Sequence, residues 1–215
     1  GSGAVVMSSL SGITTGGGNI ILGGGTDPST TPAVGNATYL DGIYLYGVTI
    51  NSGDGSITMT GRGVDGNQNY NAGIKMDNSA LTSTNGHMTL TGVGGSGTGG
   101  YSDKFGIDLE GSQLVTSGGN ISLTGTGGAL GQNGLGIDLS GGSLATTITT
   151  GSGAITIVGT SGTDTTSSAN YGVRMGDGYM AGTLITTESG PISITGVSNN
   201  TDNAFNTEGI RINAV

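Results

Sequence analysis

Hydrophobic and polar residues alternate with a period of two in short segments along the whole chain. In one such segment Ile57 and Met59 are apolar, whereas Thr58 and Thr60 are polar. This alternation places the apolar side chains on one face of a β-strand and the polar side chains on the other. No segment shows the i, i+3, i+4, i+7 spacing of an amphipathic helix, and glycine is too frequent for helices to persist. The pattern predicts strands with one buried face and no helices.

The strand segments recur as two short phrases. Variants of Ile-x-Leu-Thr-Gly occur six times, 31 to 37 residues apart, and a Gly-Ile-x-Leu phrase precedes each of the last five copies. A third short apolar element lies between the two phrases, and residues 4–7 form a degenerate first copy of the second phrase. The first phrase begins at Ile20, Ile57, Met88, Ile121, Ile155 and Ile192, and the second at Gly42, Gly73, Gly106, Gly136, Gly172 and Gly209.

Three short strands per repeat cannot bury their apolar faces alone. These faces are buried if the chain winds into a coil and the equivalent strands of successive coils pair in parallel, about 4.8 Å apart. We therefore predict an all-β fold, a right-handed parallel β-helix of about six coils that spans residues 1–215 as a single domain. Glycines after the strands are expected to allow tight corners and positive φ angles.

Composition and charge narrow the function. The chain of 215 residues contains 48 glycines and no cysteine, so cysteine-ligated metals, thiol chemistry and disulfides are excluded. Five Lys and Arg stand against fourteen Asp and Glu, giving a net charge of −9, which argues against nucleic-acid binding. No apolar run is long enough for membrane insertion, and no signal peptide is visible. Neither a cofactor nor a metal is expected.

One column of charged residues is a candidate site. If the Gly-Ile phrases stack in register, Lys75 meets Asp108 and Asp138 meets Arg174 as favourable cross-strand pairs. A polysaccharide lyase would also gather carboxylates and cations on one such face, with Asp108 and Asp138 as its acids. The other acids scatter, so no catalytic residues are assigned. The full column reads Tyr44, Lys75, Asp108, Asp138, Arg174 and Arg211.

Aromatic residues recur shortly before the Gly-Ile phrases. A row of rings along one edge could stack against sugars, and rings that pin a loop onto the coil would give the same pattern. Both interpretations remain open. The candidate glycan-binding residues are Tyr70, Tyr101, Phe105 and Tyr171.

Three further features have ordinary explanations. His87 is the only histidine and is expected to be an incidental exposed residue, because it lacks partners for a metal or catalytic site. The segment from Gly134 to Asp138 partly matches a calcium-binding nonapeptide, but only once, whereas such sites need tandem copies. Outward Thr and Ser residues would form a hydroxyl ladder, an arrangement that suits ice binding and also any solvated strand face.

The Ile-Ser-Leu-Thr-Gly phrases with glycine-rich corners resemble the β-helical repeats of large bacterial exoproteins, including filamentous-haemagglutinin-like adhesins and autotransporter passenger regions. The resemblance implies an extracellular or cell-surface shaft, often adhesive. Neither chain end shows a polar capping element, which favours end-to-end stacking with other copies of the chain or with flanking repeats. The sequence thus predicts a fibre or rod segment, with a glycan-binding adhesin as the alternative and a polysaccharide-cleaving enzyme as a third hypothesis.

Overall fold

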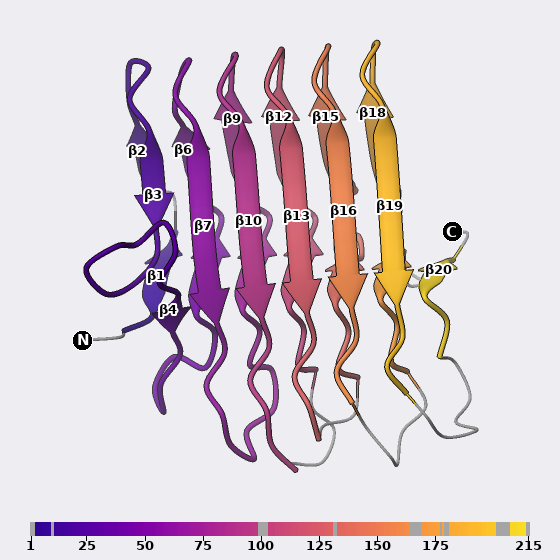
Figure 1. Ribbon diagram of the computed structural model, residues 1–215. Helices are drawn as coiled ribbons and strands as arrows, with labels where there is room; N and C mark the ends of the chain where they lie inside the picture. Colours follow the sequence, from indigo (N-terminus) through magenta and orange to yellow (C-terminus); the bar gives the residue numbers. More distant parts are fainter. Residues whose placement is uncertain are drawn as a thin grey trace.

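The chain forms a parallel β-solenoid of about six coils (Figure 1). The computed structural model describes residues 3–9, 11–98, 103–130, 133–163, 169–176, 178, 181–200 and 207–213. Every regular element within these residues is a strand, and every strand pair is parallel. The predicted coil of three short strands and the predicted lack of helices are confirmed in this part of the chain.

The strands build three sheets, and each coil passes through them in the order A, B, C. Sheet A contains β1 (Val5–Ser8), β5 (Ile43–Tyr46), β8 (Ile74–Asp77), β11 (Ile107–Glu110), β14 (Ile137–Leu139), β17 (Val173–Met175) and β20 (Ile210–Ile212). Sheet B contains β2 (Gly12–Thr14), β6 (Thr49–Asn51), β9 (Ala80–Ser83), β12 (Gln113–Thr116), β15 (Thr146–Thr150) and β18 (Thr183–Thr187). Sheet C contains β3 (Ile20–Leu22), β7 (Ile57–Arg62), β10 (Met88–Val93), β13 (Ile121–Thr126), β16 (Ile155–Thr160) and β19 (Ile192–Val197), and β4 (Ala33–Val34) pairs with the end of β7.

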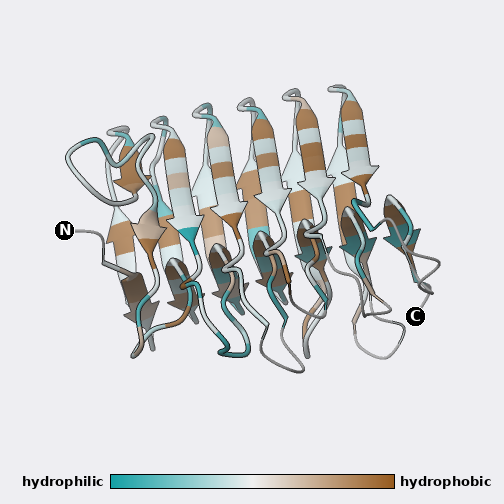
Figure 2. Ribbon diagram, turned by 60° about the horizontal axis from the view of Figure 1, so that its bottom comes forward, coloured by the Kyte–Doolittle hydropathy of each residue, from teal (hydrophilic) through white to brown (hydrophobic). Residues whose placement is uncertain are grey.

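The core is a narrow column of aliphatic side chains inside the three sheets. Alternate residues of each strand point inward, so that Ile57 and Met59 are fully buried while Thr58 and Thr60 face out. Residues at equivalent positions of successive coils then stack on one another, for example Ile121 and Ile155. Figure 2 shows the resulting alternation of apolar and polar bands along the strands. Each fully buried side chain of this kind contributes about 1.5–3 kcal/mol, which lets short strands hold together.

The glycines of the two phrases contact each other where one coil passes into the next. A Cβ atom on Gly125, which ends the Ile-Ser-Leu-Thr-Gly phrase, would lie 2.2 Å from the carbonyl oxygen of Gly136, which opens the next phrase. Close backbone approach therefore requires the glycines of the phrases. The expectation of positive φ at glycines after the strands is confirmed at the corner between sheets A and B, as at Gly47 and Gly111, and Asn78 takes a positive φ at the same corner.

The two ends of the stack differ. A loop over residues 23–32 interrupts the sheet C strand of the first coil, and Figure 1 shows it projecting beyond β3 at the N-terminal end. This loop is polar, with Asp27 accepting hydrogen bonds from Ser29 and Thr30. The expectation that neither end carries a polar element is therefore wrong for the N-terminal end. At the opposite end the inward residues Ile192 and Ile212 are 44% and 70% exposed.

Candidate functional site

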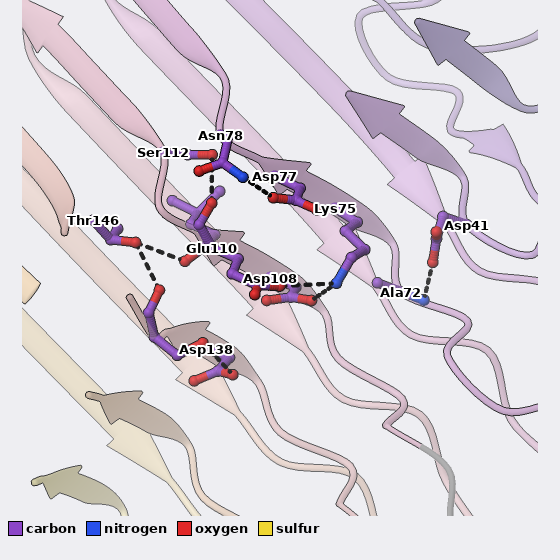
Figure 3. Close-up of polar contacts among 12 residues, drawn as sticks. Asp41, Ala72, Lys75, Asp77, Asn78, Asp108, Glu110, Ser112, Asp138 and Thr146 are labelled. Atoms are coloured by element: carbon purple, nitrogen blue, oxygen red, sulfur yellow. Dashed lines mark hydrogen bonds and ion pairs between the residues drawn. The ribbon is translucent and has the colours of Figure 1, made fainter. Parts of the chain in front are cut away.

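A column of charged side chains points away from the core on sheet A (Figure 3). Asp108 on β11 lies between Lys75 on β8 and Asp138 on β14. Arg174 on β17 is the next residue in the column after Asp138. Both predicted cross-strand pairs are confirmed, since each strand stacks in register on the one before it.

The two ion pairs are largely removed from solvent. Lys75 Nζ lies 2.6 Å from Asp108 Oδ2, and the Arg174 guanidinium binds both oxygens of Asp138, at 2.8 and 2.6 Å. Asp108 and Asp138 are only 5% and 1% exposed, although their side chains point away from the core. The Ser140 hydroxyl also donates to Asp138. The column is therefore a ladder of two buried ion pairs whose aspartates are neighbours, and both oxygens of Asp138 are already bound.

Two buried acids at this site, Asp41 and Asp108, have raised pKa values. Burial raises the pKa of Asp108 to about 7, with Lys75 opposing the shift and the neighbouring Asp138 adding to it. The pKa of Asp41 rises to about 6 for the same main reason, although its carboxylate accepts a hydrogen bond from the backbone N–H of Ala72. The carboxylates hold the pKa of Lys75 above its ordinary value against the opposing effect of burial.

A pocket of about 210 Å³ opens beside the ladder. Its walls carry more acids than bases, and two aromatic residues, Tyr70 and Phe105, contribute to them. The pocket thus offers carboxylate acceptors next to ring surface, a combination that suits hydroxyl-bearing or positively charged ligands. Its lining residues are Asp41, Tyr70, Ala72, Lys75, Asp103, Phe105, Asp108, Glu110, Asp138, Ser140, Gly141 and Arg174.

The candidate glycan-binding aromatics fall into different environments. Tyr70 is 61% exposed at the pocket, whereas Phe105 and Tyr171 are 6% and 4% exposed. The two buried rings pack with Ala72 and Leu135 in a small apolar cluster outside the main core. Arg174 lies over the Phe105 ring and Arg211 over the Tyr171 ring, at 5.9 and 5.3 Å from the ring centroids.

Phe105 and Tyr171 are therefore packed against neighbouring coils, and Tyr70 is the exposed ring of the three. Tyr101, the fourth candidate, lies outside the described residues.

His87 has a structural contact that the sequence analysis missed. Its Nδ1 accepts a hydrogen bond from the backbone N–H of Asn120 in the next coil, at 2.9 Å. Such bonds recur at this position, one residue before the sheet C strand, where the backbone N–H of one coil donates to a side chain of the preceding coil. We name this series of bonds the acceptor ladder. Ser56 N–H donates to Asn19, His87 N–H to Ser56, Asn120 N–H to His87, and Ala154 N–H to Asn120.

The acceptor ladder ends at Ala154. Ala154 has no side-chain acceptor to offer the next coil, and the residue above it, Pro191, has no N–H to donate. In the sequence, this ladder could have been recognised by aligning the residues that directly precede the Ile-x-Leu phrases. His87 is thus a backbone cap between coils.

Two other polar residues were also missed. Asp41 occupies the position that Ala72, Phe105, Leu135 and Tyr171 hold in later coils, which places a carboxylate at one end of the pocket. The side chain of Lys104 is fully buried, and its Nζ donates to the carbonyl oxygen of Gly66 at 3.1 Å. Burial lowers the pKa of Lys104.

A second hollow, which we name the end groove, lies at the C-terminal end of the stack. It has a volume of about 240 Å³ and collects inward residues of all three sheets. Ile185 of β18 and Ile194 of β19 form its floor, and Ile212 of β20 forms one wall. Its lining residues are Met175, Thr183, Ile185, Ile192, Ile194, Ile212 and Asn213.

Three further properties concern metal sites, membrane spans and similarity to known proteins. In the part of the chain that the structure describes, no group of three or more His, Cys, Asp or Glu residues is arranged to hold a metal ion. No helix among those residues is long and apolar enough to cross a membrane. The chain matches no protein-family model, no curated protein and no solved structure.

Proposed function

We propose that this chain is a structural β-helix that serves as a rod or fibre segment of an extracellular or surface protein of bacteria. The observation that carries the proposal is the end groove, where core residues of all three sheets stand open to solvent. The strand edges beside the groove, on β18, β19 and β20, carry no further strand among the described residues. A further coil would bury the exposed core and pair these edges.

The interior of the stack supports this proposal. The same Ile-x-Leu phrase that is exposed in β19 is fully buried in β13, where a following coil covers it. Among the described residues, the apolar residues of this phrase are fully buried where a coil lies on each side of them. The resemblance of the phrases to bacterial exoprotein repeats supports the proposed location.

The experiment extends the chain by one coil segment. A second copy of residues 113–126, which carry a sheet B strand and a sheet C strand, is appended after Val215. Three residues separate Leu109, which holds the position of Ile212 in its phrase, from Gln113, and three residues likewise follow Ile212. The matched control carries Leu114→Ser, Ile121→Ser and Leu123→Ser in the appended copy only, which removes its inward apolar side chains.

Amide hydrogen exchange of β18 and β19 is the measurement. We expect exchange at their open-edge amides to slow by at least about tenfold in the extended chain relative to the control, because these amides gain partners. Equal exchange in the two chains would show that the end groove does not accept a coil, and would overturn the proposal.

The pocket beside the charged ladder supports a second candidate function, glycan binding by an adhesin. Tyr70 offers an exposed ring at the pocket, and the lining holds five carboxyl groups against two cations. This charge balance favours neutral or amino sugars over uronic acids, which the carboxylates would repel. It also makes a polymer of uronic acids the poorest match.

A glycan array with neutral, amino and uronic sugars tests this candidate. We expect the Tyr70→Ala variant to lose signal on the sugars that the parent chain binds, whereas Tyr39→Ala keeps it. Tyr39 is a fair control because it is 51% exposed and does not line the pocket. Absence of binding by the parent chain, or equal loss in both variants, would remove glycan binding from consideration.

A further inference from the structure

We infer that the pocket beside the charged ladder binds a sugar with a free, protonated amine, which stacks on Tyr70 and pairs with carboxylates that no cation of the protein neutralises. This inference rests on the second candidate function, glycan binding, and names the class of sugar. It concerns the central coils and is independent of the rod function.

The charges that line the pocket do not balance. Its two cations, Lys75 and Arg174, each lie 2.6 Å from an aspartate of the ladder. Two further carboxyl groups of the lining, those of Asp41 and Asp103, form no ion pair within the part of the chain that the structure describes. Another, on Glu110, lies 3.7 Å from the Lys75 ammonium. Five carboxylates against two cations leave the ionised lining with a net charge of −3.

The two carboxyl groups without an ion pair each keep one oxygen for a ligand. Asp41 Oδ1 accepts a hydrogen bond from the Ala72 N–H at 2.7 Å, and Asp103 Oδ1 accepts one from the Asn133 amide at 2.9 Å. No donor among the described residues reaches Oδ2 of either group. Burial raises the pKa of Asp41 although the Ala72 bond and Lys75 oppose the shift. A ligand cation beside this carboxylate would supply the charge partner that it lacks.

Asp108 adds a buried acceptor to the lining (Figure 3). Its side chain is only 8% exposed, and its Oδ2 accepts a hydrogen bond from Lys75. Its Oδ1 accepts no hydrogen bond from any residue that the structure describes. Buried polar atoms in folded proteins nearly always have a partner, so this oxygen is a site for a donor that a ligand brings. Ammonium and hydroxyl groups are such donors, whereas a carboxylate is not.

Tyr70 supplies the apolar contact for a sugar ring. It is 61% exposed, whereas Phe105, the other ring of the lining, is 6% exposed and lies under the Arg174 guanidinium. Tyr70 and Asp103 hold the same position, three residues before the phrase glycine, in successive coils. The lining therefore carries an exposed ring and an unpaired carboxylate on neighbouring coils. An aromatic ring also attracts a cation placed over its face.

The size and charge of the pocket select among sugars. Its volume of about 210 Å³ is below the roughly 300–1,000 Å³ of pockets for drug-sized ligands, so the pocket holds a single sugar unit. A free amine is protonated and gains charge-assisted hydrogen bonds from the carboxylates. An N-acetyl group is neutral and gains none of these, and a uronic acid is repelled.

The test is a titration of the isotope-labelled full chain, followed by NMR, in a buffer acidic enough to protonate sugar amines. The probes are the disaccharides of glucosamine, N-acetylglucosamine and galacturonic acid. A linear diamine, cadaverine, serves as an amine without a sugar ring. The dissociation constant of each probe is measured for the parent chain and for four variants.

Two variants, Asp41→Asn and Asp103→Asn, each remove one charge from the pocket and keep an acceptor oxygen for the hydrogen bond that the carboxylate accepts. The matched control is Asp54→Asn, which makes the same change at an exposed position outside the lining. It accounts for attraction of a cationic sugar to the net negative charge of the whole chain. The fourth variant, Tyr70→Ala, removes the exposed ring.

We expect the glucosamine disaccharide to bind at least about tenfold more tightly than its N-acetylated counterpart. Asp41→Asn and Asp103→Asn should remove most of this preference, and Asp54→Asn should keep it. Tyr70→Ala should weaken the binding of both sugars alike.

Three results would overturn the inference and leave glycan binding standing. The first is equal affinity for the free and the acetylated amine. The second is a preference that Asp54→Asn reduces as much as the two pocket variants do. The third is cadaverine binding as tight as that of the amino sugar and unchanged by Tyr70→Ala, with the N-acetylated sugar still bound. No binding of any disaccharide would instead remove glycan binding and this inference together.

Discussion

A central coil and the C-terminal coil carry nearly the same sequence and differ in what lies beside them. The central phrase Ile-Ser-Leu-Thr-Gly begins at Ile121, which is fully buried, and the terminal phrase Ile-Ser-Ile-Thr-Gly begins at Ile192, which is 44% exposed. The strand length, the register and the corner glycine are the same in both. The difference teaches that burial in this fold comes from the neighbouring coil and not from the local sequence.

The charged residues of sheet A repeat the contrast. In the central coils the Asp138–Arg174 pair has side chains that are 2% and 24% exposed. Near the end, the Glu208–Arg211 pair has side chains that are 50% and 34% exposed, at a distance of 3.4 Å. The free energy of an ion pair depends strongly on this difference, because water screens exposed charges and burial makes an unpaired charge costly.

The largest expected effect comes from breaking the buried pair. Arg174→Met leaves the Asp138 carboxylate buried without its cation, and we expect it to lower the free energy of unfolding by about 3–5 kcal/mol. Arg211→Met, near the end, is expected to cost about 1 kcal/mol or less. Urea denaturation followed by circular dichroism measures both. Similar losses in the two variants would contradict the contrast.

Truncating a core side chain should also cost more stability in a central coil than at the C-terminal end, with a smaller difference between the two sites. Leu123→Ala in the central phrase creates a cavity under a following coil and should cost about 2–5 kcal/mol. The matched change in the terminal phrase, Ile194→Ala, should cost about half as much or less, because Ile194 lines the open end groove. If appending residues 113–126 raises the cost of Ile194→Ala to the central value, the neighbouring coil is the cause.

The sequence predicted the features that depend only on stacking in register. Once the phrases were aligned, the facing of Ile57 and Met59 and the pairing of Lys75 with Asp108 followed, because a parallel stack places like positions side by side. The same argument could not show that Asp108 would be buried, since its cover comes from side chains and return segments whose spacing varies between coils.

Other features could not be predicted from the aligned phrases. Phe105 and Tyr171 are buried because the residues directly before the Gly-Ile phrases pack together in a small apolar cluster. The varying offsets of the other aromatics, such as Tyr70, concealed this shared position. The acceptor ladder at His87 depends on a hydrogen bond between residues 33 positions apart. It can be recognised in sequence only when the position before each sheet C strand is aligned across coils.

The pH dependence of stability should reflect the buried acids of the central coils. Asp41 and Asp108 have raised pKa values, about 6 and about 7, so the folded chain binds more protons than the unfolded chain between about pH 4 and 7. Stability should therefore fall as pH rises through this range, by on the order of 2 kcal/mol. Asp41→Asn keeps the acceptor for the Ala72 N–H and should flatten the slope below about pH 6.

Thermal unfolding across this pH range, in parent and variant, is the measurement. The control is Asp54→Asn, the same carboxyl-to-amide change at an exposed position outside the pocket lining. An Asp41→Asn variant with the slope of the parent would show that burial of this carboxyl is not coupled to folding.

The smallest effect concerns the acceptor ladder. His87→Ala removes the acceptor for the Asn120 N–H and should cost about 0.5–1 kcal/mol, because that amide loses its protein partner at a partly solvated edge. His87→Asn supplies an amide oxygen, which is what Asn120 itself offers to Ala154 one coil later, and should restore most of the loss. Urea denaturation separates the two variants, and amide exchange at Asn120 locates the change. Equal losses in both variants would mean that the ring of His87, and not its acceptor nitrogen, supports the coil. Restoration by Asn would establish that a side-chain acceptor at this position joins one coil to the next residue that has an N–H to donate.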